Sequence, residues 1–346
     1  MLSALVLAII QERSVKFPDL ALVLNDGAKE ESNLRRIQSF FADFEVEYLA
    51  FARMLMSFVP VLRLDLSIDR TNWQFGGVDF NVLTLTVCYK GTGLPVLFEM
   101  LDKRGNSDQA ERVDLLDKFV RLFGAGRISS LCGDREFVGD RWFKYLTDKG
   151  IHFFLRLRKS CRVTLGGVNY RVDELADCLA AQRPRHLCGV DVHGLGGLRL
   201  GLKKLPLKAG EPQDYLAVLT NSAAGDALEH YRKRWSIETF FQSVKKRGFD
   251  LEQTHLKDPL RLKKLFALLC LAFALCLSEG IHRHESVKEI AAKSNGYKQN
   301  SYFRHGLNAI RKILKNANNC LAAFCRMLDR IFKTAAQISR TLNLDG

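Results

Sequence analysis

Residues 226–247 read DALEHYRKRWSIETFFQSVKKR, and this stretch is predicted to form one continuous helix. It contains neither glycine nor proline, and Gly248, a residue typical of a helix C-terminal cap, follows it directly. At about 3.6 residues per turn, one arc of this helix is apolar. The arc consists of Ile237, Phe240, Phe241 and Val244. The pattern predicts an amphipathic helix whose apolar arc packs against a core.

The face beside the apolar arc carries one acid among bases. It consists of Tyr231, Arg234, Glu238 and Lys245, in the spacing Y-x2-R-x3-E-x6-K, within about 60° of one another on an ideal helix. One interpretation is a solvated face on which Arg234 and Glu238 form an i,i+4 pair worth a few tenths of a kcal/mol. In the other, Glu238 binds a divalent metal ion while the phenol and the cations bind a phosphate backbone. Further carboxylates elsewhere in the chain would favour the second interpretation.

The composition indicates an ordinary globular protein with an unusual charge. The 346 residues are 47% hydrophobic and 26% charged, and two or three domains are expected for this length. Lys and Arg number 52 against 38 Asp and Glu, which gives a formal charge of +14. Such a balance favours a polyanionic partner, most simply nucleic acid, over a protein that is merely basic.

Cysteines and apolar runs indicate the cellular compartment in which the protein is expected to work. The nine cysteines are scattered, without a C-x2-C pair, which argues against zinc and favours a reducing cytoplasm. Residues 4–10 lack the charged flank of a signal peptide. Residues 265–277 are apolar but shorter than the roughly 20 residues of a spanning helix, so they predict a buried core helix and no membrane partner.

Periodicity divides the chain into elements. Residues 1–60 have helical patterns, which fit a DNA-binding region slightly better than a plain helical bundle. Strands are predicted at 61–69, 80–89, 94–101, 127–133 and 151–157, and helices at 107–123 and 137–148. This βββαβαβ order, completed by the helix at 226–247, is that of the ribonuclease-H-like fold. The fold class is therefore α/β.

About 65 residues separate Arg158 from the closing helix, far more than a usual connection. Short strands at 161–164, 186–192, 198–204 and 215–219, with a helical piece at 172–181, indicate a β-rich insertion. The predicted division has four parts. These are an N-terminal helical DNA-binding region at 1–60, a ribonuclease-H-like catalytic core at 61–158 and 222–250, a β-rich insertion subdomain at 159–221, and a C-terminal helical region at 251–346.

Two aspartates stand where this fold gathers acids. Asp69 ends the first predicted strand and Asp134 ends the fourth, so both are expected to converge with Glu238. Three carboxylates suit two Mg²⁺ ions about 3.5–4 Å apart, which promote phosphoryl transfer. Tyr231, Arg234 and Lys245 would then lie along the scissile strand. Asp65, on the same strand face, and Glu136, beside Asp134, are the less favoured acids.

These residues resemble the signature of a known family. Y-x2-R-x3-E-x6-K, the DRT at 69–71, the DREF at 134–137 and the FDLEQTHLKDPLRLKKL at 249–265 resemble the insertion sequence 4 family of bacterial DDE transposases. The motifs are short individually, but they occur together in the expected order and on the expected elements. The resemblance extends over most of the chain, including the β-rich insertion before the glutamate.

The resemblance implies an activity and partners. Asp69, Asp134 and Glu238 would be catalytic metal ligands for two Mg²⁺ ions, with Mn²⁺ as a substitute, and Tyr231, Arg234 and Lys245 would bind DNA. The enzyme would cleave strands at terminal inverted repeats and join the 3′-hydroxyl to target DNA, as a homodimer in the bacterial cytoplasm at the nucleoid. Some relatives form a hairpin and flip a base onto an aromatic residue of the insertion. No tryptophan lies in this insertion, where Tyr170 is the candidate substitute.

Two other functions fit the same residues. A ribonuclease-H-like nuclease without strand joining needs the same acids. A catalytically silent remnant that binds DNA would keep the basic surface alone.

Overall fold

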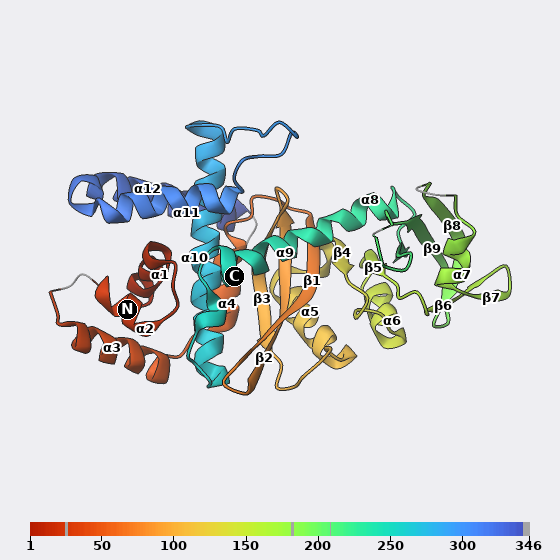
Figure 1. Ribbon diagram of the computed structural model, residues 1–346, viewed down its shortest axis with the longest axis horizontal. Helices are drawn as coiled ribbons and strands as arrows, with labels where there is room; N and C mark the ends of the chain where they lie inside the picture. The colour runs from red at the N-terminus through yellow and green to blue at the C-terminus, as the bar shows by residue number, and fades with distance from the viewer. Residues whose placement is uncertain (25–26, 181–182, 208, 342–346) are drawn as a thin grey trace.

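The computed structural model describes residues 1–24, 27–180, 183–207 and 209–341, and within them a ten-stranded mixed sheet organises the molecule (Figure 1). The strand order is β3-β2-β1-β4-β5-β10-β9-β8-β6-β7. Helices flank this sheet, and the N- and C-terminal helices gather at the end opposite β6 and β7 (Figure 1). The predicted α/β class and the helical flanks agree with this arrangement.

The first half of the sheet follows the predicted element order. Its strands are β1 Leu64–Phe75, β2 Val78–Tyr89, β3 Thr92–Met100, β4 Ile128–Gly133 and β5 Phe153–Arg156. Helix α5 Gln109–Phe123 and a 3-10 turn at Ala125–Arg127 precede β4, and α6 Asp140–Asp148 precedes β5. Strands β1, β2 and β3 are antiparallel neighbours, whereas β1, β4 and β5 are parallel. The predicted antiparallel meander of the first three strands is observed, and the predicted strands at 127–133 and 151–157 are present as β4 and β5.

The predicted insertion continues the same sheet. Its elements are β6 Arg162–Leu165, β7 Val168–Arg171, α7 Val172–Asp177, β8 Arg185–Val192, β9 Leu195–Lys204 and β10 Tyr215–Thr220. Strand β10 pairs antiparallel with β5, from Val218↔Arg156 to Thr220↔Phe154, so backbone hydrogen bonds run unbroken into the insertion. The sequence missed β7, a four-residue strand that follows the turn at Gly166 and Gly167.

The closing helix is not continuous, and this part of the prediction is wrong. It consists of α8 Ala227–Tyr231, a 3-10 turn Arg232–Arg234, α9 Trp235–Gln242 and a π-turn Ser243–Arg247. Gly248 is not a left-handed cap either, because its φ is −124°. A Cβ at Gly248 would lie 2.0 Å from the carbonyl oxygen of Ser243, so the close approach of the backbone requires glycine there.

The flanking regions are helical, as predicted. The N-terminal region holds α1 Leu2–Glu12, α2 Phe17–Leu22, α3 Glu30–Asp43 and α4 Tyr48–Met56. A 3-10 turn at Leu251–Gln253 follows the closing helix, and then come α10 Pro259–Ser286, α11 Tyr302–Lys315 and α12 Ala317–Thr341. By length and composition alone, α10 could cross a membrane, but every residue from Leu265 to Leu277 is buried. The prediction of a buried core helix there is confirmed.

Candidate active site

Asp69 and Asp134 lie side by side at one end of the parallel pair β1 and β4. The last residues in register are Ile68 and Gly133, and the two aspartates come directly after them. Asp69 does not end its strand as predicted, because β1 continues in antiparallel pairing with β2 as far as Phe75. The pairing of β1 with β4 ends just before Asp69, and this leaves space for the carboxylates of Asp69 and Asp134 at the same edge of the sheet.

Arg234 joins two of the three predicted acids. Its Nη1 lies 3.3 Å from Asp69 Oδ2, and its Nη2 donates to Glu238 Oε1 at 2.5 Å. The Arg234 residue is 5% exposed, whereas the Glu238 side chain is 44% exposed. Glu238 stands one helical turn after Arg234 on α9, so the helix itself places the acid toward β1.

Tyr231 joins the third acid to the same group. Its hydroxyl donates to Asp134 Oδ1 at 3.4 Å, and the Arg234 guanidinium lies 5.6 Å from its ring centroid. Tyr231 and Arg234, which are predicted to bind DNA, are both buried in this structure and face carboxylates. Their position indicates that they hold the acids in place.

Lys245 lies apart from the other members of the motif. Its backbone has a non-helical conformation, with φ −80° and ψ −114°, so the ideal-helix prediction of a shared face does not extend to it. The Nζ atom donates to the Asn72 carbonyl oxygen at 2.9 Å and lies 3.1 Å from Glu252 Oε1. It also lies 5.8 Å from the centroid of the Trp73 ring. Lys245 therefore fastens the end of the closing helix to β1.

The acids exceed the cations at this site. Burial, together with the nearby charges of Asp134 and Glu136, raises the pKa of Asp69 to about 7 against the opposing effects of the Arg70 backbone N–H and Arg234. Burial lowers the pKa of Arg234, but Tyr231, Glu238 and Asp69 together raise it above its usual value, so the guanidinium stays charged. When Asp69 is ionised, the group made up of Asp69, Asp134, Glu238 and the single buried cation Arg234 therefore carries more negative than positive charge.

The donor set suits a hard divalent cation. Within the part of the chain that is described, no three His, Cys, Asp or Glu side chains are close enough to form a metal site as they stand. The Arg234 guanidinium contacts both Asp69 and Glu238 in this arrangement. Carboxylate oxygens are the ligands that Mg²⁺ prefers, and the raised pKa of Asp69 indicates a place where added positive charge is favourable.

Asp65 lies on the same face of β1, four residues before Asp69, and it has its own partners. Its Oδ1 accepts from Ser130 Oγ at 2.6 Å, and its Oδ2 accepts from Lys233 Nζ at 2.7 Å. His230 Nε2 lies 2.7 Å from Ser130 Oγ and 3.5 Å from Asp65 Oδ1. Burial raises the pKa of Asp65, but hydrogen bonds from His230, Lys233 and Ser130 lower it well below its usual range. Sequence reasoning missed this network, because its members come from β1, β4 and α8 with its following turn.

Glu136 has its own hydrogen-bond partners. Both of its carboxylate oxygens accept from Arg70 Nε at 2.9 Å, and Oε1 also accepts from Ser107 Oγ at 2.9 Å. Arg70 in turn donates to Asn81 Oδ1 at 2.8 Å. This network makes Glu136 a structural partner of the β2 and α5 side of the sheet.

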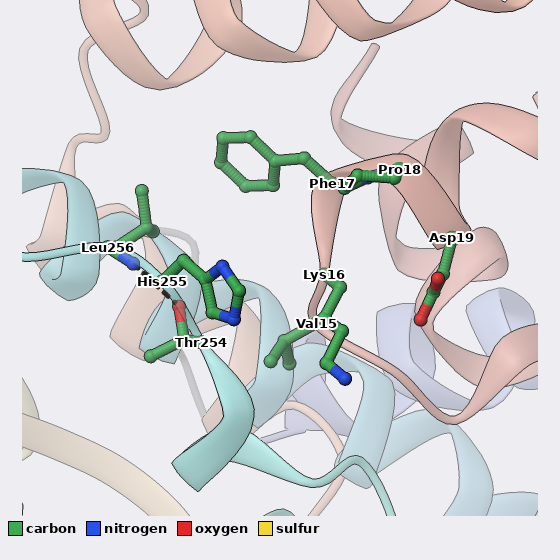
Figure 2. A pocket seen from close by; sticks show the side chains of 8 residues that line it. All are labelled: Val15, Lys16, Phe17, Pro18, Asp19, Thr254, His255 and Leu256. Carbon is green, nitrogen blue, oxygen red and sulfur yellow. Dashed lines mark hydrogen bonds between the residues drawn. The ribbon is translucent and has the colours of Figure 1, made fainter. Parts of the chain in front are cut away.

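A hollow of about 210 Å³ lies between the N-terminal region and the segment after the closing helix. Figure 2 shows Phe17, Lys16 and Val15 on one side of it and Thr254, His255 and Leu256 on the other. The His255 ring also stacks on Phe75, with centroids 5.2 Å apart. None of the three predicted acids lines this hollow, so it is separate from the acid site.

Comparisons with known proteins identify the family. A structure described as "Cryo-EM structure of piggyBac transposase synaptic complex with hairpin DNA (SNHP)" matches with a TM-score of 0.40 and 12% identity. The match covers 78% of this chain and 57% of that one, so this chain spans little more than half of that protein's length. A comparison with curated proteins finds no match. The family described as "Transposase DDE domain" matches residues 62–275, more than half of the chain. The chain therefore belongs to the transposase DDE domain family.

Proposed function

We propose that this protein is a metal-dependent DNA transposase, which cleaves strands at the ends of a mobile element and joins the 3′-hydroxyl to target DNA. The observation that carries the proposal is that the buried Arg234 guanidinium contacts both Asp69 and Glu238, while Tyr231, whose ring lies beside that guanidinium, donates to Asp134. Membership of the transposase DDE domain family supports the same activity.

The proposal extends to the core and the subfamily. The order β3-β2-β1-β4-β5, with an antiparallel meander followed by two parallel strands and a closing helix, supports a ribonuclease-H-like core. The Y-x2-R-x3-E-x6-K spacing and the strands inserted before the glutamate support the insertion sequence 4 family. In this assignment, residues 61–158 and 222–250 form the catalytic core.

Asp69, Asp134 and Glu238 would hold two Mg²⁺ ions, with Mn²⁺ as a substitute. Such ions supply an activated oxygen nucleophile and stabilise the leaving oxygen of an in-line phosphoryl transfer. Tyr231 orients Asp134 through its hydroxyl, and Arg234 holds Asp69 and Glu238 at a fixed separation. Arg234 and Tyr231 would contact a DNA phosphate once metal ions neutralise the acids that they now face.

The remaining parts of the proposal concern partners and place. Terminal inverted repeats and target DNA are the substrates, and residues 1–60 contribute to repeat recognition. Two copies would act together at paired element ends, in the bacterial cytoplasm at the nucleoid. The formal charge of +14 supports a nucleic-acid partner.

Cleavage of a labelled duplex that carries the element's terminal repeat tests the proposal. The wild type should nick at the repeat boundary with Mg²⁺ or Mn²⁺, and Glu238→Gln should abolish nicking while duplex binding is retained. Glu229→Gln is the matched control, because Glu229 lies on α8, is exposed and, within the described residues, forms its ion pair with Arg232. It should nick at the wild-type rate.

Other outcomes would replace the proposal. Duplex binding without nicking in any variant would indicate a DNA-binding remnant. Nicking without joining of pre-cut ends to a target plasmid would indicate a nuclease. Nicking that survives Glu238→Gln would exclude Glu238 as the third acid.

A further inference from the structure

Four arginines gather where three distant parts of the chain meet. Arg13 follows α1, Arg247 ends the closing helix, and Arg304 and Arg311 lie on α11. We infer that these four side chains form a phosphodiester-binding site that holds the nucleic-acid backbone beyond the acid site. The inference rests on the proposed function for the identity of its ligand, and it gives the C-terminal helical region a part in DNA binding.

The contacts at this cluster bring like charges together. Arg13 Nη2 donates to the Arg247 carbonyl oxygen at 3.2 Å, and Arg304 Nη2 donates to the same oxygen. Arg13 Nε also donates to the Gly248 carbonyl oxygen at 3.2 Å. Two guanidinium groups thus meet at one oxygen atom. Arg311 Nε donates to the Gln11 carbonyl oxygen at 2.8 Å, which brings it to the end of α1 beside Arg13.

No carboxylate in the described part of the chain balances this charge. Among the described residues, none of the four arginines forms an ion pair with an aspartate or a glutamate. Burial lowers the pKa of Arg304, and the charges of Arg13, Arg311 and Arg247 lower it further. Like charges held together without a counter-charge are unfavourable, and a bound anion relieves this cost. A phosphodiester suits the site, because guanidinium groups bind phosphate oxygens through paired donors.

A purely structural explanation accounts for only part of the cluster. Cations are favourable near a helix C-terminus, and arginines can cap the last carbonyl groups. The Arg247 carbonyl oxygen accepts from Arg13 and Arg304, one for each of its two lone pairs, so capping accounts for these two contacts. The Arg247 side chain is exposed and makes no hydrogen bond or ion pair within the described residues, so capping does not explain it.

The location fits a path that continues from the acids. Glu238 and Arg247 are nine positions apart and belong to the same closing segment, which consists of α9 and the π-turn that follows it. A nucleic-acid backbone that follows this segment away from the acid site would therefore reach the arginine cluster.

The test measures how duplex affinity changes with salt for Arg247→Gln and Arg304→Gln. Each variant should bind a duplex of random sequence roughly tenfold more weakly, and its slope of log K against log salt should be shallower by about 0.9 for each phosphate that the variant no longer neutralises. Arg127→Gln is the matched control. Arg127 also donates to backbone carbonyl oxygens, those of Val61 and Leu62, and burial alone lowers its pKa. Its slope should equal that of the wild type.

Each alternative result has a definite meaning. Unchanged slopes in folded Arg247→Gln and Arg304→Gln, with a lower Tm for Arg304→Gln, would show that the arginines only cap the helix and would overturn the inference. A loss of stabilisation by inorganic phosphate without a change in the duplex slope would show a small-anion site and would also overturn it. A wild type that binds no duplex would remove the proposed function and this inference together. Shallower slopes in a protein that never cleaves DNA would support the arginine site while the proposed catalysis fails.

Discussion

Asp65 and Asp69 occupy the same face of the same strand, but their surroundings are opposite. Asp65 accepts hydrogen bonds from Ser130 and Lys233 and lies beside His230, and these partners hold its pKa well below its usual range. Asp69 shares one guanidinium with Glu238 and lies beside Asp134, and its pKa rises to about 7. Asp65 has a hydrogen-bond partner for each carboxylate oxygen, whereas Asp69 shares its one contacting cation, Arg234, with Glu238.

The difference separates a structural carboxylate from a candidate catalytic one. A carboxylate whose partners are all internal stabilises the fold when it is ionised. A carboxylate that is crowded by other acids is stabilised by a ligand that supplies positive charge. Strand position alone does not distinguish the two residues, since both belong to β1 and face the closing helix. Substitution of Asp69 should therefore mainly lower the cleavage rate, and substitution of Asp65 should mainly lower the stability of the fold.

The largest expected effect is on cleavage by Asp69→Asn. Removal of one carboxylate from the acid site should lower the nicking rate by roughly 10³-fold or more, because the lost charge no longer holds a metal ion. Asp65→Asn should keep nicking within about tenfold of the wild type, since its effect on the acids passes through the position of α8. Rates of repeat-end nicking under single-turnover conditions measure both. Equal losses in the two variants would remove the distinction between the two acids.

The next effect is on stability, and it reverses the order of the two residues. Asp65→Ala should lower the free energy of unfolding by about 2–3 kcal/mol, because Lys233 and Ser130 lose their half-buried partner. Asp69→Asn should leave stability unchanged or raise it when no metal is added, because a neutral amide relieves the crowding of acids. Urea unfolding at neutral pH gives both values. A larger loss for Asp69→Asn would contradict the comparison.

The pH dependence of stability should also differ in sign. The folded-state pKa of Asp65 is lowered, so its stabilisation is present above the unfolded pKa of about 3.9 and is lost as pH falls through the folded pKa. The folded-state pKa of Asp69 is raised to about 7, so the folded protein loses stability as pH rises from about 4 to 7. In thermal unfolding without metal, the Tm of Asp69→Asn should not show the decline between about pH 4 and 7 that the wild type shows. The Tm of Asp65→Asn should approach that of the wild type in strong acid, where Asp65 is protonated.

The smallest effect is expected for Tyr231→Phe. The Tyr231 hydroxyl donates a long hydrogen bond of 3.4 Å to Asp134, and the ring packing is kept in the variant. Its free energy of unfolding should fall by about 1 kcal/mol or less. Nicking should fall modestly, because Asp134 keeps its position after β4. A loss as large as that of Asp69→Asn would mean that the phenol itself takes part in the reaction.

The sequence predicted the order of the core elements along the chain, and it placed Asp69, Asp134 and Glu238 in one region, for a physical reason. Period-two alternation and the turns between strands are local signals, and the fold places residues that follow neighbouring parallel strands together. Asp69 and Asp134 follow the last parallel pair, and Glu238 lies on the helix that covers them.

Other features depend on contacts between distant segments, and the sequence did not reveal them. The π-turn at Ser243–Arg247 shifts Lys245 off the predicted face, and it accompanies the close approach of Gly248 to the Ser243 carbonyl oxygen. The network of Asp65 consists of Ser130, His230 and Lys233, and no motif in the sequence connects these residues to Asp65. The pairing of β10 with β5 likewise depends on tertiary structure.

The unbroken sheet also determines when the acid site can form during synthesis. Strand β10 pairs with β5, although the rest of the insertion lies between these two strands in the chain. The pairing therefore waits until the insertion has been synthesised, and the closing helix comes later still, because it follows β10. At about 5–20 residues per second, Glu238 is translated roughly 5–20 s after Asp134. Until then the ribosome carries a chain with two adjacent aspartates and no Arg234 to pair with them. The acid site is therefore a late product of folding, and a chain released early lacks it altogether.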